Sequence, residues 1–231
     1  MKLSIIIPCL NEAELLPALL SRIKITSTTN YEIIVVDANS TDKTADIALE
    51  HNALLIQSSI ARRSIQMDMG AKVATGDVLF FIHADSIPPQ NFLEDIKTAV
   101  TTGYKFGCFR LKFMPSNGFL KFFEIFVGIP WLICRGGDQG LFITANFYKA
   151  VGGFTTSLHI MEDIDIIRKG VRKSKFAILQ SRMKTSSRDY IKYGHFRLQF
   201  AFALVHLAYW LGVDSEKLRL KLKNYLKNGR V

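Results

Sequence analysis

Short apolar runs and helically spaced apolar positions alternate through the first half of the chain. The runs at 3–8 and 32–40 are rich in β-branched residues and end in Pro, Asp and Asn, as buried strands do. The segments 11–23, 41–52 and 61–75 carry apolar residues at helical spacing. The alternation predicts an α/β domain with a mostly parallel sheet flanked by helices.

Local signals predict how these helices begin and what one of them buries. Asn11, with Glu14 three residues later, has the pattern of an N-cap with its reciprocal acid, and Ser40 is placed to cap the second helix. The third helix is expected to close at Gly76. Its apolar positions four residues apart predict the buried face: Ile65, Met69 and Val73.

Polar residues follow three of the predicted strands. They occupy positions 8–12, 37–40 and 83–86, the last after the apolar run from Val78 to His83. Ligands of open α/β sheets bind outside the carboxyl ends of the strands. A helix cap or a turn accounts for any one of these clusters, but three acid-bearing strand ends in one half-domain favour a ligand site.

The kind of ligand is narrowed by the motifs present. Neither G-x-G-x-x-G nor G-x-x-x-x-G-K-[ST] occurs, which argues against a dinucleotide-dependent dehydrogenase and a P-loop ATPase. An acid at a strand end suits a divalent cation held against a pyrophosphate, because Mg²⁺ and Mn²⁺ prefer oxygen ligands and often take only one or two carboxylates. Asp85 is predicted to have that role.

Composition adds limits on partners and compartment. The 231 residues fit one catalytic domain, and the net charge of +10 favours anionic partners without choosing among them. Cys9, Cys108 and Cys134 are odd in number and widely spaced, so neither a disulfide framework nor a zinc site is predicted. The N-terminus has too few apolar residues for a signal peptide, and a cytoplasmic location is expected.

Several segments together resemble the family-2 glycosyltransferases of the GT-A fold. The resemblance is also to a narrower group, the small bacterial radical-SAM/selenodomain-associated glycosyltransferases. It runs in consistent order from Leu3 to about Asp214 and is carried by SIIIPCLNEAELLPALL, EIIVVDANSTDKTADIA, RRSIQMDMGAKVATGDVLFFIHADS, GGDQGLFIT, GGF and MEDIDIIRK. It implies a GT-A catalytic domain over 1–188, with a nucleotide-binding half (1–88) and an acceptor half (89–188), followed by a C-terminal helical region (189–231).

The resemblance implies a site for a nucleotide-diphosphate sugar, with a UDP-sugar favoured, and a divalent metal, Mn²⁺ or Mg²⁺. Asp85 matches the last acid of the family's D-x-D metal motif, whose first acid is His83 here. His83 is then either a metal ligand or a satisfied residue at the edge of the core. The implied nucleotide-sugar contacts are Pro8, Asn11, Glu12, Asp37, Ser40, Arg62, Gln66, Ala84 and Asp85, with Arg63 in the same segment.

A second acidic cluster, Glu162, Asp163 and Asp165, stands where a helix is expected to start. Acids are favoured at helix N-termini without any catalysis. The resemblance implies the general base of an inverting displacement here, assigned to Asp163 with Glu162 as runner-up, and a structural role for Asp165. It also implies acceptor-side residues at Gly137, Asp138 and Gln139, and a weaker expectation that Arg188 meets the diphosphate.

Two apolar stretches, 118–135 and 196–213, are interrupted by polar residues, and neither is expected to span a membrane. The basic helix expected in 214–230 either lies on an anionic leaflet or docks on the core with a solvated lysine face. The first alternative predicts peripheral contact with the inner face of the plasma membrane and a lipid-linked or otherwise apolar acceptor.

Two other functions are compatible with parts of the sequence. A sugar-1-phosphate nucleotidyltransferase would carry a Gly-rich basic loop after the first strand, where this chain has PCLNEAE. A non-enzymatic basic protein of the membrane surface would explain the charge but not the acids at successive strand ends. No nucleic-acid reading module is recognisable, and nucleic acid is not expected as a partner.

Overall fold

The computed structural model describes the whole chain except residues 27–29, 127–128, 130–134 and 228–231, so Cys134 lies outside the described residues. Its strands are β1 (Leu3–Cys9), β2 (Tyr31–Asp37), β3 (Leu54–Gln57), β4 (Val78–Phe81), β5 (Ser86–Ile87), β6 (Phe106–Met114), β7 (Leu141–Thr144) and β8 (Phe176–Ser186). Its helices are α1 (Leu16–Thr26), α2 (Thr44–Glu50), α3 (Arg63–Val73), α4 (Phe92–Thr101), α5 (Gly118–Phe126), α6 (Ala145–Ala150), α7 (Glu162–Val171), α8 (Arg188–Tyr193), α9 (His195–Trp210) and α10 (Ser215–Lys227).

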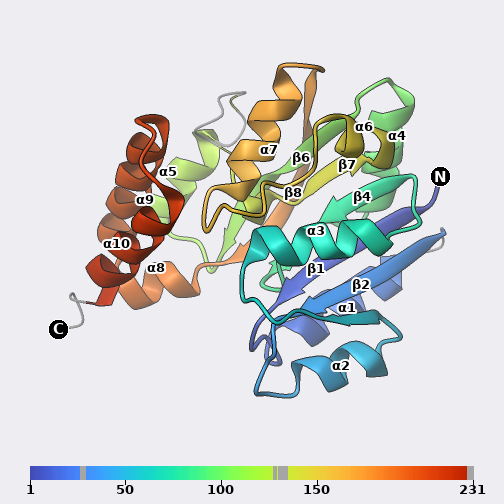
Figure 1. Ribbon diagram of the computed structural model, residues 1–231, viewed down its shortest axis with the longest axis horizontal. Coiled ribbons are helices and arrows are strands. Elements are labelled where there is room, and N and C mark those ends of the chain that lie inside the picture. Colours follow the sequence, from blue (N-terminus) through green and yellow to red (C-terminus); the bar gives the residue numbers. More distant parts are fainter. Residues whose placement is uncertain (27–29, 127–128, 130–134, 228–231) are drawn as a thin grey trace.

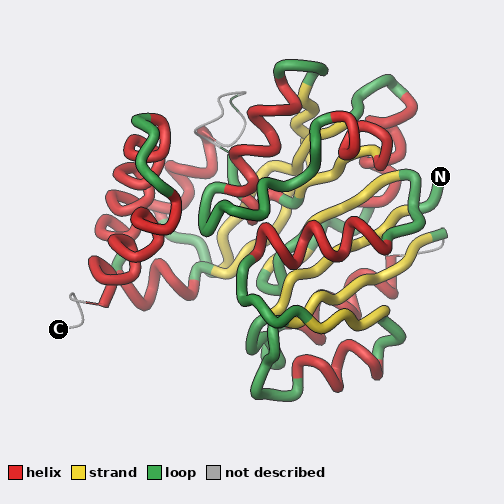
Figure 2. Tube along the Cα trace, viewed as in Figure 1, coloured by secondary structure: helices red, strands yellow, loops and turns green. Residues whose placement is uncertain are grey.

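One twisted sheet runs through the molecule in the order β3-β2-β1-β4-β7-β6-β8-β5 (Figures 1 and 2). Strands β3, β2, β1 and β4 are parallel, and so are β6 and β8. Strand β7 is antiparallel to both of its neighbours, β4 and β6, and β5 is antiparallel to β8. This mixed but mostly parallel sheet with helices on its faces confirms the predicted fold class.

Alternate residues of each central strand build two cores, one on each face of the sheet. In β1, Ile5 and Ile7 pack with α1 and α4 on one face, while Ile6 packs with α3, α6 and α7 on the other. This alternation follows from the two-residue period of a strand. A third, smaller core joins α5, α8 and α9 to β6, and it sets the C-terminal helices beside the sheet (Figure 1).

The predicted caps of the first two helices are wrong. Helix α1 begins at Leu16 and not near Asn11, whose φ of 55° places it in the left-handed region that Asn tolerates. The Asn11 side chain instead accepts a hydrogen bond from the N–H of Thr41 at 2.8 Å. Ser40 accepts one from the N–H of Asn11 at 2.8 Å, and α2 begins only at Thr44. These side chains hold two loops together instead of capping helices.

The predicted buried face of the third helix is only partly right, because Met69 packs against the core but Val73 does not. In α3, Val73 is 44% exposed, and the buried residues are Ser64, Gln66, Met67 and Gly70. A Cβ at Gly70 would stand 2.5 Å from Cγ2 of Ile6 in β1. The helix therefore approaches the sheet through small and polar residues together with Met67, a combination that an apolar periodicity does not reveal.

Glu32 ties the start of β2 to β1 and to the turn before β4. Its carboxylate accepts hydrogen bonds from the Ser4 hydroxyl (2.5 Å), the Thr75 N–H (2.7 Å) and the Lys2 ammonium (3.0 Å). Partial burial opposes the charge, yet these hydrogen bonds lower the pKa of Glu32 to about 2. The charged form is therefore the one that the fold stabilises.

Glu32→Gln is expected to lower the free energy of unfolding by about 1–2 kcal/mol near neutral pH. Because the pKa in the folded state lies below the unfolded value of about 4.3, this contribution is present above that value and disappears as pH falls toward about 2. Urea unfolding at neutral and acidic pH measures it, with the exposed Glu50→Gln as control. Equal losses for the two variants would contradict the expectation.

Candidate active site

The loops after β1 and β2 form one hydrogen-bonded unit at the carboxyl edge of the sheet. The buried carboxylate of Asp37 accepts hydrogen bonds from the hydroxyl of Ser40 and from its N–H, the latter at 3.0 Å. Ser40 and Thr41 in turn hold Asn11, as described above. Three predicted nucleotide contacts, Asn11, Asp37 and Ser40, therefore lie together.

Three other predicted nucleotide contacts are buried beneath this edge. The amide nitrogen of Gln66 donates to the carbonyls of Cys9 (2.9 Å) and Val36 (2.8 Å), at the ends of β1 and β2. Gln66 is 3% exposed, and Pro8 and Ala84 are buried as well. Gln66 thus holds the ends of β1 and β2 together, and all three residues are buried below the surface of the carboxyl edge.

Arg62 reaches away from the strand ends. It donates to the carbonyl of Thr156 at 2.9 Å and to Nε2 of His159 at 2.6 Å, both in the loop that precedes α7. Its contact with a nucleotide sugar stays a prediction.

Glu12 is bound by an arginine from the far end of the chain. Arg188, the first residue of α8, donates to both carboxylate oxygens of Glu12 at 2.9 and 3.2 Å and lies 3.8 Å from the carboxylate of Asp85. The hydrogen bonds to Glu12 raise the pKa of Arg188, although its partial burial opposes this. A fixed positive charge thus stands between the first loop and the acid of the predicted metal motif.

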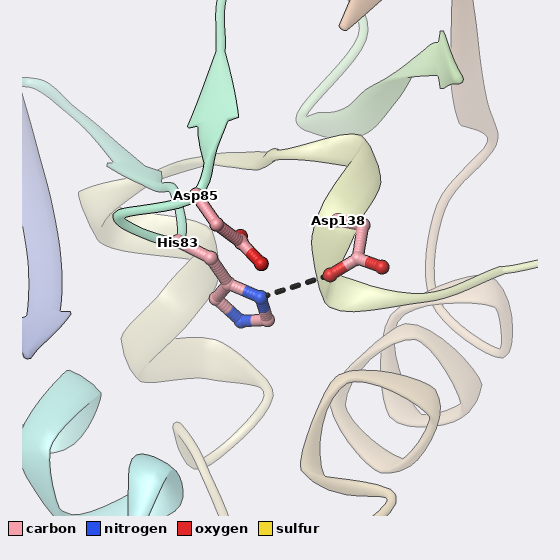
Figure 3. Close-up of side chains that lie close together, drawn as sticks. All are labelled: His83, Asp85 and Asp138. Carbon is pink, nitrogen blue, oxygen red and sulfur yellow. Dashed lines mark hydrogen bonds and ion pairs between the residues drawn. The ribbon is translucent and has the colours of Figure 1, made fainter. Parts of the chain in front are cut away.

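His83, Asp85 and Asp138 gather just beyond the end of β4 (Figure 3). One possible ligand atom from each lies within 4.8 Å of the other two. His83 Nδ1 stands 3.1 Å from Oδ1 of Asp138. His83 is 6% exposed, and its Nε2 has no hydrogen-bond partner among the described residues. Asp138 was predicted on the acceptor side, and the structure also places it against the metal motif.

The cluster fits a small divalent cation. Burial, and then the negative charge of Asp138, raise the pKa of Asp85, so two carboxylates repel each other here. For Asp138, burial also disfavours the charge, but the hydrogen bond from His83 lowers its pKa. A cation would relieve the repulsion, and carboxylate oxygens with an imidazole nitrogen form an acceptable donor set for Mn²⁺.

Asp163 faces the same cluster across Gly137. A Cβ on Gly137 would overlap Oδ2 of Asp163 and stand 2.6 Å from Nε2 of His83, so both side chains close on this glycine. Burial and the adjacent Glu162 raise the pKa of Asp163 to about 7. Such a carboxyl is poised to accept and release a proton near neutral pH.

The chain presents Asp163 through an unusual turn. Met161, immediately before α7, has a φ of 69°, a left-handed conformation that is costly for a residue other than Gly. Glu162 is 5% exposed, whereas Asp163 is half-buried. Asp165 points elsewhere and binds Thr155 (2.6 Å), Arg168 (3.0 Å) and Lys169 (3.0 Å). These contacts agree with the structural role predicted for Asp165.

A cavity of about 730 Å³ opens beside these acids. Its polar end includes His83, Asp138, Asp163 and Arg63. Although burial opposes its charge, nearby carboxylates, Glu162 first among them, raise the pKa of Arg63. The remaining walls are mainly apolar and come from β6, α5, α8 to α10 and the loop before α7. The cavity includes the predicted acceptor-side residues, Gly137, Asp138 and Gln139, and leaves out the Asp37–Ser40 loop.

The family model described as glycosyl transferase family 2 matches residues 4–139, more than half of the chain. The chain belongs to this family. Its membership confirms the predicted enzyme class, and it favours a glycosyltransferase over a nucleotidyltransferase or a non-enzymatic basic protein. The family model reaches from β1 to the cluster at Asp138 and thus includes the carboxyl edge of the sheet.

Curated relatives of this glycosyltransferase match it over a limited length. The uncharacterized glycosyltransferase Rv0539 of Mycobacterium tuberculosis is 37% identical over 82 residues, 36% of each chain. The PGL/p-HBAD biosynthesis glycosyltransferase Rv2957 of the same species is 40% identical over 88 residues, 36% of this chain and 34% of the relative. The matches therefore span about a third of these relatives.

Solved structures share the fold at low sequence identity. The mannosyltransferase PcManGT from Pyrobaculum calidifontis, in complex with GDP-Man and Mn²⁺, superposes with a TM-score of 0.69 at 17% identity over 97% of this chain and 69% of that chain. S. aureus TarS 1-349 in complex with UDP-GlcNAc gives 0.65 at 18% identity over 80% and 58% of the two chains. These similarities support the GT-A fold predicted for this glycosyltransferase.

Sequence reasoning missed most of the cavity of this glycosyltransferase. The walls from α5 and α9 come from the two apolar stretches, which were considered only as possible membrane spans. No described helix has the length and apolar character required to cross a bilayer. The aromatic residues of these stretches are the feature of the sequence that could have indicated an apolar cavity.

Proposed function

We propose that this protein is an inverting glycosyltransferase that moves a sugar from a UDP-sugar to a hydroxyl acceptor with Asp163 as the general base. The observation that carries the proposal is the convergence of Asp163 and the His83–Asp85–Asp138 cluster on the two sides of Gly137. An acid–base group and a cluster suited to a cation thus stand together where the cavity reaches the edge of the sheet.

In the proposed reaction, Asp163 accepts the proton of the acceptor hydroxyl as its oxygen bonds to the anomeric carbon. The bond from that carbon to the diphosphate oxygen breaks, and its electron pair leaves with the nucleoside diphosphate. Attack opposite the leaving group inverts the configuration at this carbon. General-base catalysis of this kind contributes about 10²- to 10⁴-fold in rate.

We assign the cation to Asp85 and Asp138, with His83 as a third ligand. When bound, Mn²⁺ or Mg²⁺ would offset the negative charge that develops on the leaving diphosphate. Arg188 and Arg63 add fixed positive charge on either side of the cluster. Asn11, Glu12, Asp37 and Ser40 are assigned to the nucleotide, whereas Gln66, Pro8 and Ala84 are assigned to positioning the strand ends. The complexes of TarS and PcManGT with nucleotide sugars support a donor of this class.

Several finer predictions belong to this proposal. They are the membership of the radical-SAM-associated branch, the division at residues 88 and 188, and the peripheral contact of the C-terminal helices with the inner face of a membrane. The choice of UDP rests on the family resemblance, since PcManGT was solved with GDP-Man.

Donor binding is tested by thermal shift with UDP, GDP, CMP and dTDP, each with and without Mn²⁺. Selective binding to the folded state raises its melting temperature, by an amount that corresponds to about 2.7 kcal/mol at a ligand concentration 100 times Kd. We expect a Mn²⁺-dependent shift with UDP that Asp85→Ala abolishes and that the exposed control Glu94→Ala on α4 retains. The absence of a shift with all four nucleotides would refute the donor site.

A further inference from the structure

The large cavity changes character along its length. Charged and polar groups line it around Asp163. Most of its other lining is apolar, with Leu111 and Phe113 of β6 and Phe202 of α9, although Gln199 and His206 of α9 also line it. Its volume of about 730 Å³ lies in the range of small-molecule sites, about 300–1,000 Å³. The chemistry of these walls suits a ligand that has an apolar body and a polar end.

Helix α9 is mainly apolar, yet few of its residues are buried. Among its sixteen residues, only Leu198 and Ala201 are buried. Phe196 is 77% exposed, and Phe200 and Leu207 are 57% and 58% exposed. A large exposed apolar patch ordinarily contacts protein or lipid. The exposed face therefore has the composition of a surface that meets an apolar phase.

The exposed face is continuous with the cavity. Phe122 of α5 and Phe202 of α9 line the cavity and are also 55% and 37% exposed. A second cavity of about 360 Å³ between α9 and α10 shares Val205 and Leu222 with the first. The exposed apolar side chains of these helices thus adjoin both cavities, and the first cavity reaches the acids.

The surroundings of this face are positively charged. Residues 188–227, from α8 to the end of α10, contain eight lysines and arginines but only three acidic residues. Lys221 lines the second cavity, and Lys217 and Lys223 lie on either side of Lys221 in the sequence of α10. Basic residues beside exposed aromatic and aliphatic side chains complement a bilayer with anionic headgroups. This charge favours a lipid surface over a second, equally basic copy of the chain.

We propose that the cavity binds the apolar body of an amphiphilic acceptor drawn from an anionic lipid surface, with the acceptor hydroxyl at Asp163. The inference rests on the proposed function, because it assigns the acceptor of that same reaction. The exposed face of α9 and the basic residues of α10 lie on the lipid surface, and the acceptor enters past Phe122 and Phe202.

Two detergents with the same headgroup, dodecyl and hexyl β-glucoside, test the cavity below their micelle concentrations. Each additional methylene buried adds to the affinity, so we expect the dodecyl compound to bind at least about tenfold more tightly. Ala203→Trp, which places an indole at the cavity wall, should weaken dodecyl binding at least about tenfold. Ala18→Trp, at an exposed alanine of α1, should change it by less than about twofold.

Vesicles of phosphatidylcholine, alone or mixed with phosphatidylglycerol, test the surface in a co-sedimentation assay. We expect binding only to the mixed vesicles and its loss at high salt. Leu207→Glu on the exposed face of α9 should reduce vesicle binding at least about fivefold while leaving dodecyl β-glucoside binding within about twofold.

Equal affinities for the two glucosides, or undiminished dodecyl binding by Ala203→Trp, would overturn the proposal. So would equal binding to both kinds of vesicle, or a concentration-dependent dimer whose formation Leu207→Glu prevents. The UDP thermal shift distinguishes failure of the proposed function from failure of the acceptor proposal. If the protein binds dodecyl β-glucoside but no nucleotide, it has an amphiphile site without a donor site, and the acceptor assignment is wrong.

Discussion

Asp163→Asn is expected to lower kcat for sugar transfer by about 10²- to 10⁴-fold, while the Kd of the nucleotide stays within about twofold. The amide keeps the shape of the side chain but cannot accept the hydroxyl proton. Asp163 borders the cavity, whereas the predicted nucleotide loops at Asn11 and Asp37 do not line it. Single-turnover transfer and nucleotide thermal shift measure the two effects separately.

Glu162, the residue before Asp163, provides the control for the assignment of the base. Glu162 is 5% exposed and was the runner-up for the base, so Glu162→Gln should lower kcat by a smaller factor than Asp163→Asn. A larger loss in Glu162→Gln would move the base to that residue. An equal loss of nucleotide binding in Asp163→Asn and Asp85→Ala would contradict the division between base and donor site.

The raised pKa of Asp163 gives the same assignment a pH signature. Because the base acts when deprotonated and its pKa is about 7, kcat should rise about tenfold from about pH 6 to about pH 8 and then level off. The folded-state pKa lies above the unfolded value of about 3.9, so ionisation of Asp163 lowers stability as pH rises through about 7. Asp163→Asn should therefore raise Tm at about pH 8.

Gly137→Ala is expected to reduce transfer at least about tenfold, because the added methyl would overlap Oδ2 of Asp163 and crowd Nε2 of His83. Gly137 does not have a left-handed φ, so alanine is compatible with its backbone. The loss should arise from displacement of the base relative to the cation cluster. We also expect a weaker Mn²⁺-dependent thermal shift with UDP.

Gly136→Ala is the matched control. A Cβ at Gly136 meets open space, and its φ of −167° is accessible to any residue. Transfer by Gly136→Ala should stay within about twofold of the wild-type rate, and circular dichroism and Tm should show that both variants fold. Equal losses in the two variants, or full activity of Gly137→Ala, would mean that the close approach at Gly137 does not matter for catalysis.

The sequence was most informative where strands end. The β-branched runs at 3–8 and 32–40 predict the parallel strands, and the acids that follow them do lie along one edge. Helix starts were less predictable, since Asn11 and Ser40 have side chains equally suited to a cap or to a loop–loop hydrogen bond. Which of these forms depends on the approach of two loops about thirty residues apart.

The site was only partly visible in the sequence. Asp85 could be proposed from its place after a strand and Asp163 from the family resemblance, but the pairing of His83 with Asp138 joins residues 55 positions apart. The bidentate contact from Arg188 to Glu12 spans 176 positions. No local pattern encodes such contacts, because they are fixed by packing of the C-terminal half against the sheet.

Strand β7 has a consequence for how the chain could be divided. It pairs with β4 on one side and β6 on the other, so the halves predicted at 1–88 and 89–188 share a single sheet. A fragment ending at residue 88 would leave Val78–Phe81, four apolar residues that are all buried in the intact chain, as an unpaired edge. Exposed apolar edges recruit other strands, so β7 also protects the N-terminal half of the sheet from self-association.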